Sequence, residues 1–321
     1  MLLDLIFLAV GIFLLVKGAD LLIDGSSNIA RRFGIPEFVI GLTLVAFGTS
    51  LPEFTVNVAA SIKRASEISL GNVVGSNIAN ILLILGISAL INPISVHATF
   101  VKKEIPVNLF ITLTLIAMAN DVLLNHSPIS QISRSEGIVL ILTFVGYMYF
   151  LVAYLEKLEV SDEDRDRLMH PVKAVIFTVL GLAGLILGAE LTVDGAVNLA
   201  KALGVSEAVI GLFLVAVGTS LPELFASAVA AKKGNPDIAL GNVAGSNIFN
   251  ATLVLGTSAI INPIPVPDRA NYDFLVLFVA TLLLVISYFT GRKYTIDRKE
   301  GLAFLILYFA YALFSWYSEL R

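Results

Sequence analysis

The sequence predicts an all-α polytopic membrane protein, with ten transmembrane helices in two inverted-topology repeats of five helices each. Two observations lead to this fold class: the composition of the chain, and a block of polar motifs that occurs twice. Of 321 residues, 57% are hydrophobic and only 14% are charged, whereas soluble domains carry about 25% charged residues. With a mean hydropathy of +0.89, the chain must turn most of its surface to lipid.

Charge and cysteine content exclude several classes of function. The net charge is −4 and no basic run is present, so nothing indicates a nucleic-acid partner. The absence of cysteine excludes disulfides, thiolate metal sites and cysteine nucleophiles. No phosphate-binding loop and no set of nucleophile and base is found, so we expect neither an enzyme nor a cofactor.

Ten mostly apolar windows are long enough to cross the hydrocarbon core, which requires about twenty residues. The first window has no preceding basic region and no small-residue cleavage site, so we expect it to be retained. The windows are 2–23, 37–62, 68–91, 104–121, 137–155, 172–194, 207–231, 238–261, 272–290 and 301–319.

Lys and Arg in the loops predict the orientation, because positive residues stay on the cytoplasmic side. The richer side includes the longest polar stretch, 156–171, which we interpret as a cytoplasmic linker with a solvated acidic run. This linker divides a first five-helix repeat, 1–155, from a second, 172–321. Because the number of windows is even, both termini are expected outside the cell (plasma) membrane.

The two halves of the chain repeat each other at an offset of 170 residues. Val39–Phe54 returns as Val209–Leu224 with thirteen of sixteen positions identical, and Ser69–Ile94 matches Ala239–Ile264 at eighteen of twenty-six. Five windows separate equivalent points, and five is odd, so the second half must cross the membrane in the opposite sense. Inverted repeats are typical of secondary transporters, whose substrate site lies near the bilayer midplane between the repeats.

Two glutamates lie deep inside predicted spans. Glu53 and Glu223 each end a Gly-Thr-Ser-Leu-Pro-Glu segment in the second and seventh windows, which contain no Lys or Arg. A charged side chain at the bilayer centre costs about 2.5–3.5 kcal/mol, so a bound cation is the simplest counter-charge. Protonated glutamates that hydrogen-bond between helices are the alternative.

The prolines before these glutamates predict broken helices. Pro52 and Pro222 have no N–H to donate to the carbonyl four residues back, so carbonyl oxygens become free near Gly48 and Gly218, where lipid cannot bind them. The same turns carry Ala46 and Ala216. In a continuous helix, positions three and four apart share a face, which would place hydroxyls beside each glutamate: Thr49 and Ser50 beside Glu53, and Thr219 and Ser220 beside Glu223.

The third and eighth windows add amides and hydroxyls in the segments 71–80 and 241–250. The glycine pairs Gly71/Gly75 and Gly241/Gly245 have the four-residue spacing that lets helices approach closely. We interpret four residues as ligands of cations or water: Ser76, Asn80, Ser246 and Asn250. For four further amides, cation binding and hydrogen bonding between helices remain equally open: Asn72, Asn77, Asn242 and Asn247.

This set of oxygen donors fits a hard cation such as Ca²⁺, which takes six to eight oxygen ligands. Na⁺ accepts the same ligands, while softer metals would require Cys or His near the site. Two carboxylates neutralise one Ca²⁺, and mutual exclusion of two cations at one site produces antiport.

With these motifs, the chain resembles the sodium/calcium exchanger family of the calcium/cation antiporter superfamily along essentially its whole length. The resemblance implies a central site exposed alternately to the two sides by sliding of the first and sixth spans. It implies Na⁺ and Ca²⁺ as transported substrates and the lipid bilayer as surroundings, with no obligate protein partner evident. It also implies that the ligands include Glu53, Glu223, Thr49, Ser50, Thr219, Ser220, Ala46, Ala216, Ser76 and Ser246, to which the residue pattern described above adds Asn80 and Asn250.

One departure from the family pattern concerns the coupling ion. Many relatives carry Asp at the position of Asn250, whereas both Asn80 and Asn250 are amides here. The calcium/proton branch typically has Glu in the segments where this chain has Gly-Ser-Asn, which favours Na⁺ over H⁺. A Ca²⁺/H⁺ or K⁺-dependent antiporter remains the alternative within the class. A passive cation channel is the alternative outside it.

Overall fold

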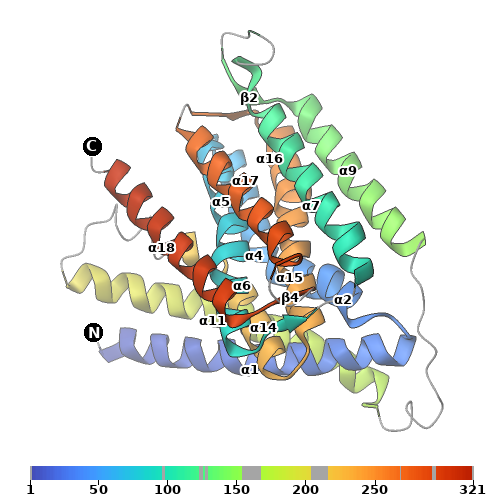
Figure 1. Cartoon of the computed structure of the whole chain (residues 1–321). Helices are drawn as coiled ribbons and strands as arrows, with labels where there is room; N and C mark the ends of the chain where they lie inside the picture. Colours follow the sequence, from blue (N-terminus) through green and yellow to red (C-terminus); the bar gives the residue numbers. More distant parts are fainter. Residues whose placement is uncertain are drawn as a thin grey trace.

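The computed structural model describes residues 2–95, 98–122, 126, 129–153, 168–203, 216–267, 269–290 and 294–319. These residues form a bundle of helices with two short two-stranded ladders (Figure 1). The first half contains α1 (Leu2–Phe33), α2 (Glu37–Ile40), η1 (Gly41–Val45), α3 (Ala46–Thr49), α4 (Leu51–Ile62), α5 (Glu67–Ile78), η2 (Ala79–Ile84), α6 (Leu85–Ile91), β1 (Ile94–Ser95), α7 (Ala98–Met118), β2 (Gln131–Ile132) and α9 (Arg134–Ala153). The second half contains α11 (Pro171–Ala202), α13 (Ala216–Gly218), α14 (Leu221–Lys232), α15 (Pro236–Phe249), η4 (Asn250–Val254), α16 (Leu255–Ile261), β3 (Ile264–Pro265), α17 (Ala270–Ser287), β4 (Thr295–Ile296) and α18 (Arg298–Glu319).

Seven helical segments of the described residues are long and apolar enough to cross a membrane, and one bent pair, Glu37–Thr49 with Leu51–Ile62, makes up to eight. The protein is therefore an all-helical, multi-pass membrane protein. The predicted window 104–121 corresponds to a shorter apolar helix, Glu104–Met118. The predicted window 207–231 falls partly on residues 204–215, outside the described residues, so the count of ten stays a prediction.

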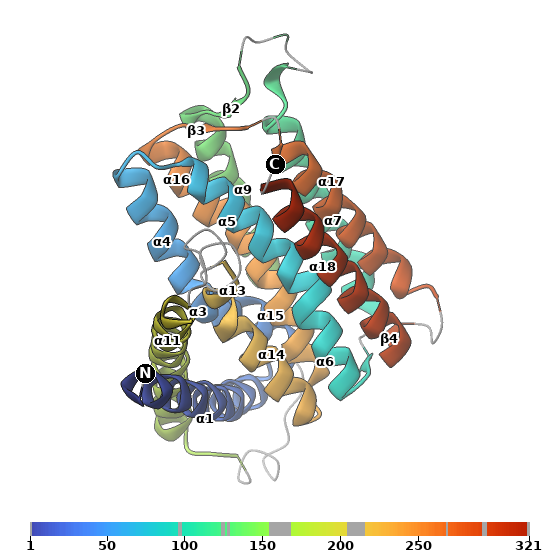
Figure 2. The same cartoon turned by 90° about the vertical axis from the view of Figure 1, so that its left-hand side faces the viewer.

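The two longest helices, α1 and α11, lie side by side across one side of the remaining bundle (Figures 1 and 2). Their backbones approach closely at glycines spaced seven residues apart. A Cβ atom at Gly11 would lie 2.7 Å from the Thr192 nitrogen, and one at Gly18 would lie 2.7 Å from the Leu185 nitrogen. One at Gly25 would lie 2.6 Å from the Thr178 nitrogen. Because the partner number falls as the glycine number rises, the two helices are antiparallel.

Elements of the two halves interleave around the centre. The strand pairs are β1 with β4 and β2 with β3, and both are antiparallel. Helix α9 packs on α16 where a Cβ at Gly256 would lie 2.9 Å from the Gly137 oxygen, and α18 packs on α6 where a Cβ at Gly301 would lie 2.9 Å from the Gly86 oxygen. Each of these contacts pairs one half of the chain with the other, so both halves contribute to one core.

The centre of the bundle is formed by α4, α5, α14 and α15. Every residue of α15 from Ile238 to Phe249 is buried, although this segment carries three amide or hydroxyl side chains. The expected close approach is confirmed at Gly241 and Gly245, because Cβ atoms there would meet the backbone of Phe38 and Leu42. At Gly71 and Gly75 no described atom lies within 4 Å of such a Cβ, so the described residues show no close approach there. The polar side chains of α15 are thus held inside protein and away from lipid.

Candidate cation-binding site

The site begins at a break in each of two equivalent helices. Ser50 leaves the helical conformation (φ −85°, ψ 6°) between α3 and α4, and the two helical pieces meet at a bend of 45°. Ser220 has nearly the same conformation (φ −90°, ψ 6°) before α14. Pro52 and Pro222 stand in the first turns of the new helices, so the predicted break is confirmed. The positive N-terminal ends of α4 and α14 are therefore available to stabilise negative charge.

Glu53 and Glu223 occupy those first turns, and both side chains are fully buried. The Oε1 atom of Glu223 accepts a hydrogen bond from Ser50 Oγ at 2.8 Å, and the Oε1 atom of Glu53 accepts one from Ser220 Oγ at 3.2 Å. The second oxygen of each carboxylate, Oε2, is buried and has no hydrogen-bond partner among the described residues. Each glutamate thus presents one oxygen that is free to bind a ligand.

The hydroxyls meet the glutamate of the other half, which differs from the expectation for a continuous helix. A continuous helix predicts Ser50 beside Glu53, but the Ser50 hydroxyl donates to Glu223 and lies 3.0 Å from Ser246 Oγ. Ser220 Oγ correspondingly lies 3.2 Å from Ser76 Oγ. The physical reason is the break in the helix at each serine, because a serine with non-helical ψ no longer shares a helix face with the glutamate that follows it.

The threonines that precede these serines bind amides across the centre. Thr49 Oγ1 donates to Asn242 Oδ1 at 3.1 Å, and Thr219 Oγ1 donates to Asn72 Oδ1 at 3.4 Å. The Ala46 carbonyl accepts a hydrogen bond from Ser50 N at 3.0 Å and lies 3.3 Å from Thr49 Oγ1. When the Thr49 hydroxyl donates to Asn242, the second lone pair of this carbonyl remains for a ligand. Ala216 begins the single described turn of α13, and the residues before it lie outside the described residues.

Asn80 and Asn250 lie where α5 and α15 continue into the π-helical turns η2 and η4. Both side chains are almost fully buried. Their Oδ1 atoms have no hydrogen-bond partner in the described part of the chain. Isolated π-helical turns frequently mark functional sites, and here each leaves one amide oxygen without a protein partner.

Two residues near the site were missed by the sequence reasoning. Asn57 is buried and its Nδ2 donates to the Glu53 carbonyl at 2.6 Å. Ser227, at the equivalent position, accepts a hydrogen bond from Asn242 Nδ2 at 2.9 Å. The available signal was the spacing, since each lies four residues after a glutamate and so shares its helix face.

The site brings together carboxylate, hydroxyl and amide oxygens. Among the described residues, no group of three or more His, Cys, Asp or Glu side chains could hold a metal ion. The carboxylate, hydroxyl and amide oxygens that are present are donors of the kind that hard cations prefer. Two buried negative groups with free oxygens can bind such a cation and release it again when the carboxylates are otherwise neutralised.

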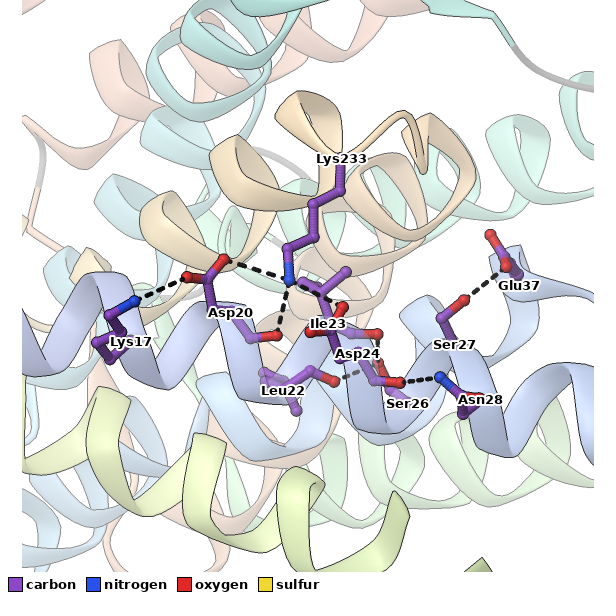
Figure 3. A network of polar contacts seen from close by, with 10 residues as sticks. All are labelled: Lys17, Asp20, Leu22, Ile23, Asp24, Ser26, Ser27, Asn28, Glu37 and Lys233. Atoms are coloured by element: carbon purple, nitrogen blue, oxygen red, sulfur yellow. Dashed lines mark hydrogen bonds and ion pairs between the residues drawn. The ribbon is translucent and has the colours of Figure 1, made fainter. Parts of the chain in front are cut away.

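A separate polar network joins α1 to the end of α14 (Figure 3). Lys233 Nζ lies 3.2 Å from Asp20 Oδ1 and 2.8 Å from Asp24 Oδ1, and it donates to the Asp20 carbonyl at 3.0 Å. Further along α1, Arg31 Nε lies 2.7 Å from Glu37 Oε1. Lys233 follows the last residue of α14, whereas Glu223 lies in the first turn of that helix, so the Lys233 network is separate from the buried glutamates.

Comparison with known proteins identifies the family. The family model for the sodium/calcium exchanger protein matches residues 3–153 and 173–317. The sodium/calcium exchanger MaX1 of Methanosarcina acetivorans is 36% identical over 98% of this chain and 99% of its own length. The inner membrane protein YrbG of Escherichia coli is 38% identical over 89% of both chains.

Solved structures of the sodium-calcium exchanger NCX_Mj have the same fold. For crystals soaked with 10 mM Na⁺ and zero Ca²⁺, the TM-score is 0.84 at 36% identity, covering 96% of this chain and 97% of the other. The chain therefore belongs to the sodium/calcium exchanger protein family, a family of cation antiporters.

Proposed function

We propose that this protein exchanges Na⁺ for Ca²⁺ across the membrane by alternating access to the central site. The observation that carries the proposal is the pair Glu53 and Glu223, two fully buried carboxylates that each keep one oxygen without a described partner. Buried charges are paired or bind metal ions, and the spans around these glutamates contain no Lys or Arg. A cation inside the site balances the charge, and either Ca²⁺ or Na⁺ satisfies oxygen donors of this kind.

The ligands of the transported cations are proposed to come from both halves of the chain. The glutamates supply charge, while hydroxyls, amides and main-chain carbonyls complete the shell. Because Ser50 and Ser246 share the Glu223 side and Ser220 and Ser76 share the Glu53 side, two equivalent half-sites are formed. The full proposed set is Glu53, Glu223, Thr49, Ser50, Thr219, Ser220, Ala46, Ala216, Ser76, Ser246, Asn80 and Asn250.

The architecture that supports alternating access is proposed to be ten spans in two inverted repeats, 1–155 and 172–321, joined by the linker 156–171. The antiparallel course of α1 and α11, whose sequences are equivalent at an offset of 170, supports the inversion. The protein is proposed to lie in the plasma membrane, and the distribution of Lys and Arg supports an orientation with both termini outside.

Movement of α1 and α11 past the remaining helices is the proposed gating step. The two helices contact each other through glycines, and such an interface lets them move as one unit. Leu182 and Val193 of α11 pack over Gly48 and Gly218, directly before the two helix breaks. A shift of α11 would therefore uncover the turns that carry the site.

The test is uptake of ⁴⁵Ca²⁺ into proteoliposomes loaded with Na⁺, with choline, or with an acidic buffer. Na⁺/Ca²⁺ exchange requires internal Na⁺ for uptake. Uptake driven only by internal acid would reassign the protein to Ca²⁺/H⁺ exchange, and stimulation by K⁺ would indicate a K⁺-dependent exchanger. Uptake that is indifferent to all of these gradients would favour a passive channel.

A further inference from the structure

Four asparagines form a closed set of hydrogen bonds at the meeting point of α5 and α15. Asn77 Nδ2 donates to the Asn247 carbonyl at 3.2 Å, and Asn247 Nδ2 donates to the Asn77 carbonyl at 3.5 Å. Asn80 Nδ2 donates to Asn247 Oδ1 at 2.9 Å, and Asn250 Nδ2 donates to Asn77 Oδ1 at 3.3 Å. All four side chains are buried, at 7% exposure or less. We name this set the amide tetrad.

The pattern of donors and acceptors fixes the orientation of every amide in the tetrad. A main-chain carbonyl only accepts hydrogen bonds, so Asn77 and Asn247 must turn their NH₂ groups toward each other's backbone. Their own Oδ1 atoms then point away, and these oxygens also only accept. Asn80 and Asn250 must therefore present their NH₂ groups to them, which leaves the Oδ1 atoms of Asn80 and Asn250 without described partners.

This orientation has a direct consequence for cation binding. A cation is bound by an amide oxygen and repelled by the partial positive charge of an amide NH₂ group. If Asn80 or Asn250 were rotated by 180°, a donor would replace an acceptor at the site. An ionised carboxylate at either position has no N–H to donate, so it would place two acceptors face to face at the tetrad.

From these contacts we infer that Asn77 and Asn247 are positioning residues of the transport site, which hold the oxygens of Asn250 and Asn80 toward the cation. They act through their neighbours and are not themselves ligands. The tetrad also requires a neutral, donating group at positions 80 and 250, so the negative charge of the site comes from Glu53 and Glu223 alone. This inference rests on the proposed function and names residues beyond the proposed ligand set.

The test is a double-mutant cycle on full-length protein in proteoliposomes, with the KM for external Ca²⁺ and the maximal uptake rate measured separately. Asn247→Ala and Asn77→Ala are each expected to raise the KM about tenfold or more, as is typical when a residue that orients a metal ligand is lost. In an Asn80→Ala background, Asn247→Ala should add less than about twofold, because its effect passes through Asn80.

Asn92→Ala is the matched control. Asn92 Nδ2 also bridges the two halves, by donating to the Ala231 carbonyl at 3.1 Å, but it has no contact with the tetrad. Its removal should leave the KM within about twofold of wild type. If an alanine variant is not recovered folded, the serine variants at 77 and 247 give the same comparison, since a hydroxyl is too short to hold the neighbouring amide.

Two outcomes overturn the inference: an unchanged KM in a folded Asn77 or Asn247 variant, or KM increases for Asn80 and Asn247 that multiply as independent effects. The rise in melting temperature on adding Ca²⁺ provides a binding measurement that does not depend on transport. Wild-type vesicles without Na⁺-driven uptake would instead refute the proposed function. The two failures are therefore distinguishable.

Discussion

The two glutamates at the centre differ in their partners from the acidic residues that form ion pairs. Glu37 and Asp24, for example, lie beside Arg31 and Lys233, whereas Glu53 and Glu223 each accept serine hydroxyls at one oxygen and have no ion pair among the described residues. A buried carboxylate with a free oxygen is stable only in the presence of a proton or a cation. Removing the carboxylate should therefore abolish transport without harming the fold.

Glu53→Gln and Glu223→Gln are each expected to reduce Na⁺-driven ⁴⁵Ca²⁺ uptake to the level of empty liposomes. The melting temperature without Ca²⁺ should stay the same or rise, because the amide avoids burial of a charge. The stabilisation by added Ca²⁺ should be lost.

Glu136→Gln serves as the control for this pair. Glu136 accepts a hydrogen bond from Ser133 N at 2.7 Å at the start of α9, and glutamine fills such a capping position as well as glutamate does. Uptake and Ca²⁺-dependent stabilisation should both be retained. Wild-type uptake in either central variant would contradict the assigned site.

At the scale of elements, the close contact of α1 and α11 at glycines predicts how a substitution there changes the stability of the protein. A Cβ at Gly18 would lie 2.7 Å from the Leu185 nitrogen and 2.8 Å from the Gly181 oxygen, and backbone atoms cannot rotate away. Gly18→Ala is therefore expected to destabilise the protein by about 1–3 kcal/mol. It should also slow exchange, because the α1–α11 pair can no longer pack closely.

Gly146→Ala in α9 is the matched substitution. No described atom lies within 4 Å of a Cβ at this position, and alanine favours a helix over glycine by about 1 kcal/mol. Its melting temperature should equal or exceed that of wild type. Thermal unfolding of the two purified variants tests this prediction. A Gly18→Ala melting temperature equal to or above that of wild type would show that the interface tolerates a methyl group.

The sequence predicts most of these elements but not how they meet. Apolar windows locate the helices, and Pro52 and Pro222 locate the two breaks, because each reflects a local property of the chain. The bend angle at Ser50 is set by packing against distant helices, so the sequence assigned the Ser50 hydroxyl to Glu53, whereas it binds Glu223. The contact spans 173 residues, and no local pattern encodes it.

At the scale of the whole molecule, the repeat relates two equivalent clusters, each of one lysine and two acidic residues. One cluster forms ion pairs in the structure and the other forms none among the residues that the structure describes. Lys233 binds Asp20 and Asp24 on α1 (Figure 3). At an offset of 170, the equivalents are Lys63, Glu190 and Asp194. All three are exposed, and the structure gives no ion pair between Lys63 and either acidic residue within its described ranges. In an alternating-access cycle between the two repeats, these clusters are expected to close in turn.

Neutralising Lys233 and neutralising Lys63 should therefore shift the balance between the two states of the cycle in opposite directions. An exposed ion pair is worth about 0.2–1 kcal/mol, so the population ratio should change by up to about fivefold. Lys233→Gln should reduce the fraction of molecules in which α1 contacts the end of α14. Lys63→Gln should increase that fraction.

The absence of native cysteine makes this shift measurable with spin labels at Phe33→Cys and Lys232→Cys, one on each helix. Distance distributions should then give the two populations directly, with the Lys63→Gln/Lys233→Gln double variant close to wild type. A shift in the same direction for both single variants would show that the lysines serve general stability. No shift in either would show that other contacts, such as the α1–α11 glycine interface, determine which side of the transporter is closed.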